Sequence, residues 1–313
     1  MSSLRISATS LGINYLPEYV AAASGAFAAR DLEVVSVARD PWTGVLDDLA
    51  AGEADLVLGG VWVPAMYAGM GRDLVAVGQL NARFPKVVVT REPVEDFHWG
   101  WLAGRTVLAP GAGGTAGYEF TAGVMRENGI DPSTVKFVRD LSTPMLRELY
   151  EHGLGDVILA DTLLASQLEL AGLGHSACRL ADVAGPMPNS VYYTDRSRLD
   201  ELHESCVALM AGIQDAMRDL CAGADPTSVI DALWPAGPRE ALLASAATLA
   251  ADGTWSGVRI DPDALERWCA ILRDRGLMAS SASSADLVDA RVVDALGPED
   301  GVVPAATDIG AGA

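Results

Sequence analysis

The chain has 313 residues and a formal charge of −20 at pH 7, and half of its residues are hydrophobic. This length supports a large buried core and favours two domains, and the composition is globular rather than disordered or fibrous. The negative charge argues against nucleic acid as a partner, because phosphate backbones are negative as well. No apolar run approaches the ~20 residues of a membrane span, so no membrane segment is expected.

The cysteines do not follow a metal-binding pattern. Cys178, Cys206, Cys221 and Cys269 include no CxxC pair, and no histidine stands at ligand spacing from any of them. Structural zinc is therefore not expected, and the thiols are interpreted as small buried apolar groups. The sequence also indicates no cofactor.

The N-terminus shows no secretory signal. Residues 1–3 lead directly into residues 4–8, which alternate like a first strand. A signal would need a basic start, an apolar run and a small-residue cleavage site. The expectation is a cytoplasmic protein as the sequence stands, or an extracytoplasmic one if a signal has been removed.

Strand-length apolar runs alternate with helical patterns, which predicts βαβ units and a parallel sheet. In the first ninety residues, strands are predicted at residues 4–9, 32–38, 54–60, 73–80 and 86–92, and helices at 17–30, 43–51 and 63–70. A second α/β set has strands at 105–111, 135–138 and 156–160 and helices at 115–128, 143–151 and 162–171. A strand at 190–195 then returns to the first lobe, followed by helices at 198–221, 226–233, 238–251 and 263–275.

These elements predict an α/β protein of two lobes, the second inserted into the first, with a helical C-terminal part. Lobe 1 is assigned residues 1–93 and 190–290, lobe 2 residues 94–189, and residues 291–313 a flexible tail. Ligands of such sheets bind outside the carboxyl ends of the strands, so the cleft between the lobes is the expected site.

Aromatic and polar residues follow several of the predicted strands. Ser10 and Tyr15 belong to the loop after the first strand, Trp42 follows the second, and Trp62 follows the third. Two indoles at equivalent strand ends can wall a cleft against an apolar or planar ligand. Packing in the core, or an ordinary loop, is the alternative for each of these side chains.

A glycine-rich turn at residues 110–119 joins a predicted strand to a helix. The amides of Gly113, Gly114 and Thr115 could converge there on an anionic group. The spacing matches neither a dinucleotide fingerprint nor an ATP phosphate loop, and a plain tight turn is the alternative. Asp161 stands between a strand and a helix, where it could cap the helix or accept a hydrogen bond from a ligand.

The sequence shows no catalytic constellation. It contains neither GxSxG nor HExxH, and neither of the two lysines, Lys86 and Lys136, has a recognisable Schiff-base context. The four histidines are His98, His152, His175 and His203, and none belongs to such a motif.

Several segments in chain order resemble the type II periplasmic-binding-protein superfamily, specifically its sulfonate-, nitrate- and thiamine-pyrimidine-binding branch. LPEYVAAASGAFAARDLEV is similar to the opening helix and strand, and LDDLAAGEADLVLGG to the helix, Gly-acidic-x-Asp and strand element. WLAGRTVLAPGAGGTAGY is similar to the entry into the second lobe, with Arg105 at a position usually held by lysine. GVMRENGIDPSTVKFV and HGLGDVILADTLLA match the next units, so the resemblance runs from about residue 4 to residue 277.

The resemblance implies two hinged lobes that close on a ligand held by strand-end loops. The candidate ligand-binding residues are Ser10, Tyr15, Trp42, Gly60, Trp62, Gly113, Gly114, Thr115, Tyr118, Asp161 and Tyr192.

Three functions are compatible with this resemblance, and the third is a ligand sensor without transport or catalysis. The first is a binding protein that delivers a small anionic or zwitterionic organic solute to an ABC permease, which requires export. The second is a cytoplasmic enzyme on the same fold, such as a lyase, decarboxylase, desulfinase or pyrimidine synthase, acting on a small aromatic or heterocyclic acid. The cysteine-rich motif and PLP-lysine context of the pyrimidine synthases are absent. Desulfinase relatives carry a cysteine in the first loop, where this chain has Ser10 and Asn14.

Overall fold

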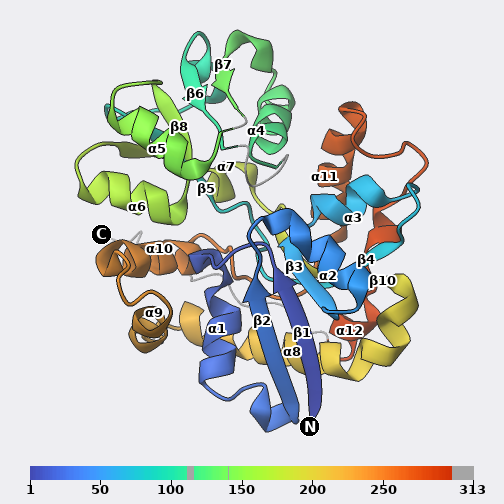
Figure 1. The fold of residues 1–313 in the computed structure, drawn as a ribbon. Coiled ribbons are helices and arrows are strands. Elements are labelled where there is room, and N and C mark those ends of the chain that lie inside the picture. The colour runs from blue at the N-terminus through green and yellow to red at the C-terminus, as the bar shows by residue number, and fades with distance from the viewer. Residues whose placement is uncertain (111–115, 140, 298–313) are drawn as a thin grey trace, which may run out of the picture.

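The computed structural model describes residues 1–110, 116–139 and 141–297. Two α/β lobes face each other, each built around a five-stranded sheet (Figure 1). The chain starts in the lower lobe of the view, crosses to the upper lobe and returns, as the sequence predicts. No described helix has the length and apolarity needed to cross a lipid bilayer.

The first sheet has the strand order β2-β1-β3-β10-β4. Its strands β1, β2 and β3 are parallel to one another, whereas β10 runs antiparallel to both of its neighbours. The sheet is therefore mixed rather than parallel, because the returning strand enters from the opposite direction. The bounds are Ser2–Ala8 for β1, Leu32–Ala38 for β2, Leu56–Gly60 for β3, Leu74–Gln79 for β4 and Ser190–Asp195 for β10.

Both faces of the first sheet are covered by helices, and alternate residues of its inner strands pack on opposite sides. In β3, Leu56 and Leu58 join one apolar cluster and Val57 joins another. The Leu56 face packs against α1 and α8, and the Val57 face against α2 and α3. The bounds are Leu16–Ala23 for α1, Val45–Ala51 for α2, Trp62–Tyr67 for α3 and Leu199–Cys221 for α8.

The second sheet has the strand order β7-β6-β8-β5-β9 and is also mixed. Strand β5 pairs antiparallel with β8 and β9, so residues 86–90 belong to this sheet and not to the first. The assigned lobe boundary at residue 93 therefore lies beyond the first strand of the second sheet. The bounds are Lys86–Thr90 for β5, Thr106–Leu108 for β6, Lys136–Val138 for β7, Val157–Asp161 for β8 and His175–Arg179 for β9.

Helices cover the second sheet on both faces as well. Helix α4 lies on one face, and α5 and α6 lie on the other. Strand β9 and helix α7 were not predicted, because both are only five residues long and show little periodicity. The bounds are Ala116–Glu127 for α4, Thr143–Glu151 for α5, Thr162–Leu170 for α6 and Leu180–Ala184 for α7.

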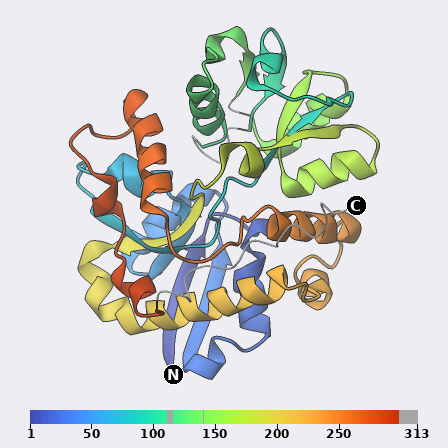
Figure 2. The same cartoon turned by 180° about the vertical axis from the view of Figure 1, so that it is seen from behind.

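Two C-terminal helices connect the lobes (Figures 1 and 2). Helix α11 packs against both α3 and α4, and α10 packs against α6. Through α11, one apolar cluster extends from the first sheet to the second without a break. The bounds are Thr227–Leu233 for α9, Arg239–Ala251 for α10 and Pro262–Asp274 for α11.

The expectation of a flexible tail from residue 291 is wrong for residues 291–297. Residues Arg291–Asp294 form α12, and Val292 and Val293 are each only 2% exposed. Arg291 also forms ion pairs with Asp200 and Asp289. Residues 291–297 are thus part of the first lobe, and residues 298–313 lie outside the described chain.

Candidate functional site

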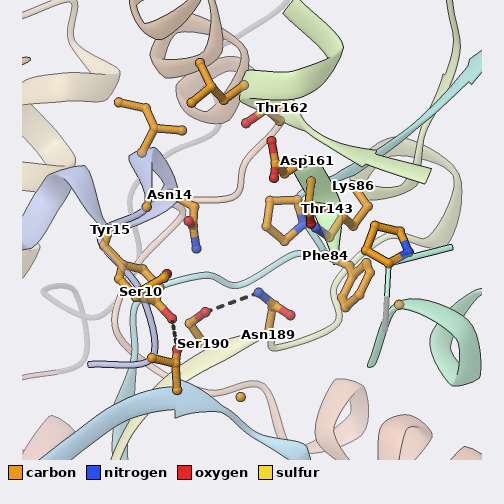
Figure 3. Close-up of a pocket in the computed structure, with 18 of the residues that line it drawn as sticks. Ser10, Asn14, Tyr15, Phe84, Lys86, Thr143, Asp161, Thr162, Asn189 and Ser190 are labelled. Carbon is orange, nitrogen blue, oxygen red and sulfur yellow. Dashed lines mark hydrogen bonds between the residues drawn. The ribbon is translucent and has the colours of Figure 1, made fainter. Parts of the chain in front are cut away.

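A cavity of about 510 Å³ opens between the two lobes and is lined by residues of both (Figure 3). It lies where β1, β3, β6 and β8 end. The antiparallel strands β5 and β10 contribute their amino ends at the same edge, through Lys86 and Ser190. Loops, helix starts and strand ends from two separate sheets therefore surround one volume, as the fold predicts.

The loop after β1 forms one wall of the cavity and is held in place by side-chain hydrogen bonds. The side-chain Nδ2 of Asn14 donates to Asn81 Oδ1 at 2.9 Å, and the side-chain Nδ2 of Asn81 donates back to the backbone carbonyl oxygen of Asn14 at 2.8 Å. The Tyr15 hydroxyl lies 2.9 Å from Thr9 Oγ1, and burial raises the pKa of this phenol. Ser10 at the tip of the loop remains exposed, so its hydroxyl is available to a ligand.

Two indoles form the apolar part of the same lobe's wall. Trp42 lies in the 3-10 turn after β2, and Trp62 opens α3 directly after β3. The Trp62 ring packs against Trp268 of α11 with centroids 6.4 Å apart, which fixes it from behind. The indole also lies close against Gly60 at the end of β3.

Gly60→Ala is expected to displace the Trp62 indole. A Cβ at this position would lie 2.1 Å from ring carbons Cη2 and Cζ2, and overpacking of this kind costs about 1–3 kcal/mol. We expect a lower melting temperature together with at least a ~10-fold weaker affinity for any ligand of this cavity, measured by calorimetry. Gly100→Ala is the matched control, because Gly100 does not line the cavity and its nearest contact would be 3.2 Å. Unchanged affinity in Gly60→Ala would contradict this role.

The second lobe contributes helix starts and the only charged groups among the described lining residues. Asp161 caps α6, its Oδ1 accepting from the Leu164 backbone N–H at 2.8 Å. The next residue, Thr162, accepts a 2.6 Å hydrogen bond from Ser245 of α10, which ties this wall to the first lobe. Thr143, the first residue of α5, also lines the cavity. The predicted helix-capping role of Asp161 is confirmed, and its predicted contact with a ligand stays a prediction for a residue that borders the cavity.

Lys86 lines the cavity but is not among the ligand-binding residues predicted from the sequence. It stands at the first position of β5 and lines the cavity beside Asp161. The rule that ligands bind at the carboxyl ends of parallel strands does not point to Lys86, because β5 is antiparallel and its amino end lies at the cavity. Asn189 and Ser190, at the amino end of β10, were missed for the same reason. The scarcity of lysine, with only two in the chain, was the available signal.

The structure brings together the candidates Ser10, Tyr15, Trp42, Gly60, Trp62 and Asp161 around the cavity. It places two others elsewhere. Tyr118 packs edge-on against Phe137, with ring centroids 5.0 Å apart, and lies beneath Arg139. Gly113, Gly114 and Thr115 lie outside the described residues.

Tyr192 is fully buried below the cavity and does not line it. Strand β10 alternates its side chains, so Tyr192 points to the face that packs on α1, where its hydroxyl donates to Glu18 at 2.6 Å. Burial raises the pKa of the Glu18 carboxyl, although the hydrogen bonds from Tyr192 and Ser36 act in the opposite direction. This pair supports the helix after the first loop and is not open to a ligand.

Nucleophilic sulfur is not found at the described cavity wall, which contains neither cysteine nor histidine. Burial raises the pKa of Cys178, Cys206 and Cys269 to about 12, so these groups are thiols at neutral pH. Across residues 1–110, 116–139 and 141–297, no cluster of three or more His, Cys, Asp or Glu is arranged to hold a metal ion.

Comparison with known proteins places this geometry in a family. The model of the NMT1/THI5 like family matches residues 13–226, which is more than half of the chain. No curated protein matches the sequence.

Solved structures with the same fold include three solute-binding proteins. The periplasmic aliphatic sulphonate binding protein SsuA of Escherichia coli superimposes with a TM-score of 0.74 at 15% identity, covering 92% of each chain. The alkanesulfonate-binding protein SsuA of Xanthomonas axonopodis pv. citri, bound to MOPS, gives 0.70 at 16% identity, covering 93% of this chain and 99% of its own. The nitrate-binding protein NrtA of Synechocystis PCC 6803 gives 0.67 at 14%, covering 96% and 90%. By its family model and its two-lobed type II periplasmic-binding-protein fold, this chain belongs to the NMT1/THI5-like family.

Proposed function

We propose that this protein is the substrate-binding component of an ABC-type import system and takes an anionic or zwitterionic organic solute between its lobes. The observation that carries the proposal is a cavity that both lobes line, with an ammonium group on one side and two indoles on the other. Its volume of about 510 Å³ suits a small molecule. Relatives of the same fold whose names state sulfonate or nitrate binding support the proposal.

The cavity walls fit reversible capture. A ligand that touches Trp42 or Trp62 on one lobe and Asp161 or Lys86 on the other favours the closed arrangement, because only closure makes both sets of contacts. The Ser245–Thr162 hydrogen bond already joins the same two lobes at 2.6 Å, and Thr162 borders the cavity. Delivery to an importer requires the protein to work outside the cytoplasmic membrane, and cell fractionation of the native producer tests that part.

A thermal-shift screen with sulfonates, aromatic carboxylates and pyrimidines tests the binding function. A specific ligand is expected to stabilise the folded state by about 2.7 kcal/mol at a hundredfold excess over its Kd. Trp42→Ala and Asp161→Ala are expected to abolish most of this shift. Trp101→Ala is the control, since Trp101 packs under Arg105 in the second lobe and does not line the cavity.

Two outcomes would overturn the proposal. An undiminished shift in both cavity variants would show that the ligand binds elsewhere. Mass spectrometry after incubation gives the second: a stabilising compound recovered unchanged supports binding alone, whereas its conversion to a product would identify an enzyme of the same fold.

A further inference from the structure

Lys86 and Asp161 stand directly opposite each other in the second sheet, at the cavity wall. They are paired residues in the antiparallel register of β5 and β8, and both line the cavity. Side chains paired in this way point to the same face of a sheet, with Cβ atoms about 4.5–5.5 Å apart. The two opposite charges are therefore presented side by side (Figure 3).

The two charged groups do not satisfy each other. They form no ion pair within 4.0 Å, and no described residue accepts a hydrogen bond from the Lys86 ammonium. Asp161 uses Oδ1 to cap α6, and Oδ2 has no donor among the described residues. The cap fixes the carboxylate, so its second oxygen is presented to the cavity without a further loss of side-chain freedom.

Every other described residue that lines the cavity is neutral. A ligand with an acid group alone would satisfy Lys86 but would leave the Asp161 oxygen unpaired and repel it on closure. A ligand with an amine alone would satisfy Asp161 but would leave the Lys86 ammonium unpaired and repel it. A ligand that carries both charges satisfies both groups. The cavity discriminates against either single-charge analogue because that analogue leaves one of the two protein charges unpaired.

Resting on the proposed function, we infer that the cavity selects a zwitterion whose ammonium and acid groups are one or two carbons apart, as in an α-amino acid or a β-aminosulfonate. The acid binds Lys86 and the ammonium binds Asp161. The rest of the molecule lies against Trp42, Trp62 and Phe84. The short separation follows from the side-by-side placement of the two protein charges.

Matched sets of three compounds test this inference by calorimetry. Each set holds a zwitterion, its amine-free acid and its acid-free amine: taurine, ethanesulfonate and ethylamine; phenylalanine, 3-phenylpropionate and phenethylamine; tryptophan, indole-3-propionate and tryptamine. At least one zwitterion is expected to bind more than ~10-fold tighter than both of its analogues. Asp161→Asn is expected to remove the preference over the acid, and Lys86→Gln the preference over the amine.

Asp161→Asn keeps the fold because asparagine also caps helices. Two control variants resemble the test variants but lie away from the cavity: Lys136→Gln changes the chain's other lysine, and Asp131→Asn changes another capping aspartate of the second lobe. Both controls are expected to leave the preference unchanged.

If, in every set, the acid or the amine binds as tightly as its zwitterion, the inference is overturned while the binding function stands. Failure of all three zwitterions would also overturn it, and the wider ligand screen would then decide the proposed function separately. A zwitterion preference that survives in both Asp161→Asn and Lys86→Gln would show that these two residues do not bind the ligand's charged groups.

Discussion

Trp268→Ala is expected to lower the free energy of unfolding by about 3–5 kcal/mol, because it deletes a fully buried aromatic side chain from the core. Trp268 is 1% exposed and lies at the centre of the cluster that the two lobes share. Its ring contacts Trp62 of the first lobe, and it meets Phe120 of α4 edge-on with centroids 5.7 Å apart. Phe120 in turn stacks on Phe84 at 3.9 Å, beside the cavity.

Denaturant unfolding of the wild type and the variant measures this loss. Because the cluster joins the lobes, we also expect Trp268→Ala to weaken ligand binding through a less well-held Trp62. Trp101→Ala is the control: Trp101 is only partly buried and lies outside the shared contact with α11, so a smaller loss is expected. A Trp268→Ala variant as stable as the control would show that the shared core does not hold the lobes together.

Asp55→Asn is expected to destabilise the first lobe by about 2–3 kcal/mol at neutral pH. The buried Asp55 carboxylate accepts hydrogen bonds from the Arg5 backbone N–H and side chain at 2.8–3.0 Å, and from Arg198 at 3.0 Å. Removing one partner of a fully buried ion pair costs about 3–5 kcal/mol. The value is lower here because the Arg5 side chain is 47% exposed and partly screened by water.

The contribution of Asp55 to the free energy of unfolding decreases as the pH falls. Burial alone would raise the pKa of this carboxyl, but the hydrogen bonds and charges of Arg5 and Arg198 hold its pKa below the usual 3.8. A lowered pKa in the folded state gives stability that is fully present above pH 3.8 and is lost as the pH falls through the folded-state value. The stability difference between wild type and Asp55→Asn should therefore shrink in acid.

Unfolding curves from pH 7 down to pH 3 measure this difference. Asp73→Ala is the matched control, because Asp73 pairs with Arg196 at the surface and its side chain is 70% exposed, so a loss below ~1 kcal/mol is expected. A difference between wild type and Asp55→Asn that stays constant or grows as the pH falls would contradict the role of the ionised carboxylate.

The sequence by itself determined the α/β class, the two lobes and most of the helices. The helices predicted at residues 143–151 and 226–233 match α5 and α9 to within one residue, and the apolar runs match the inner strands. These features depend on residues close in sequence, whose spacing decides which face of an element is apolar. The same sequence patterns predicted Trp42, Trp62 and Asp161 at the ends of strands, and all three residues line the cavity.

Only the tertiary structure decided the direction of β5 and β10 and the sheet that β5 joins. An apolar run reads the same in either direction, so the antiparallel entry of β5 and β10 could not be seen in it. That direction brings Lys86 opposite Asp161 and places Ser190 at the cavity edge, and the alternation along β10 turns Tyr192 away. The shared core around Trp268 likewise depends on α11 packing against elements more than a hundred residues earlier in the chain, a long-range contact that local pattern does not specify.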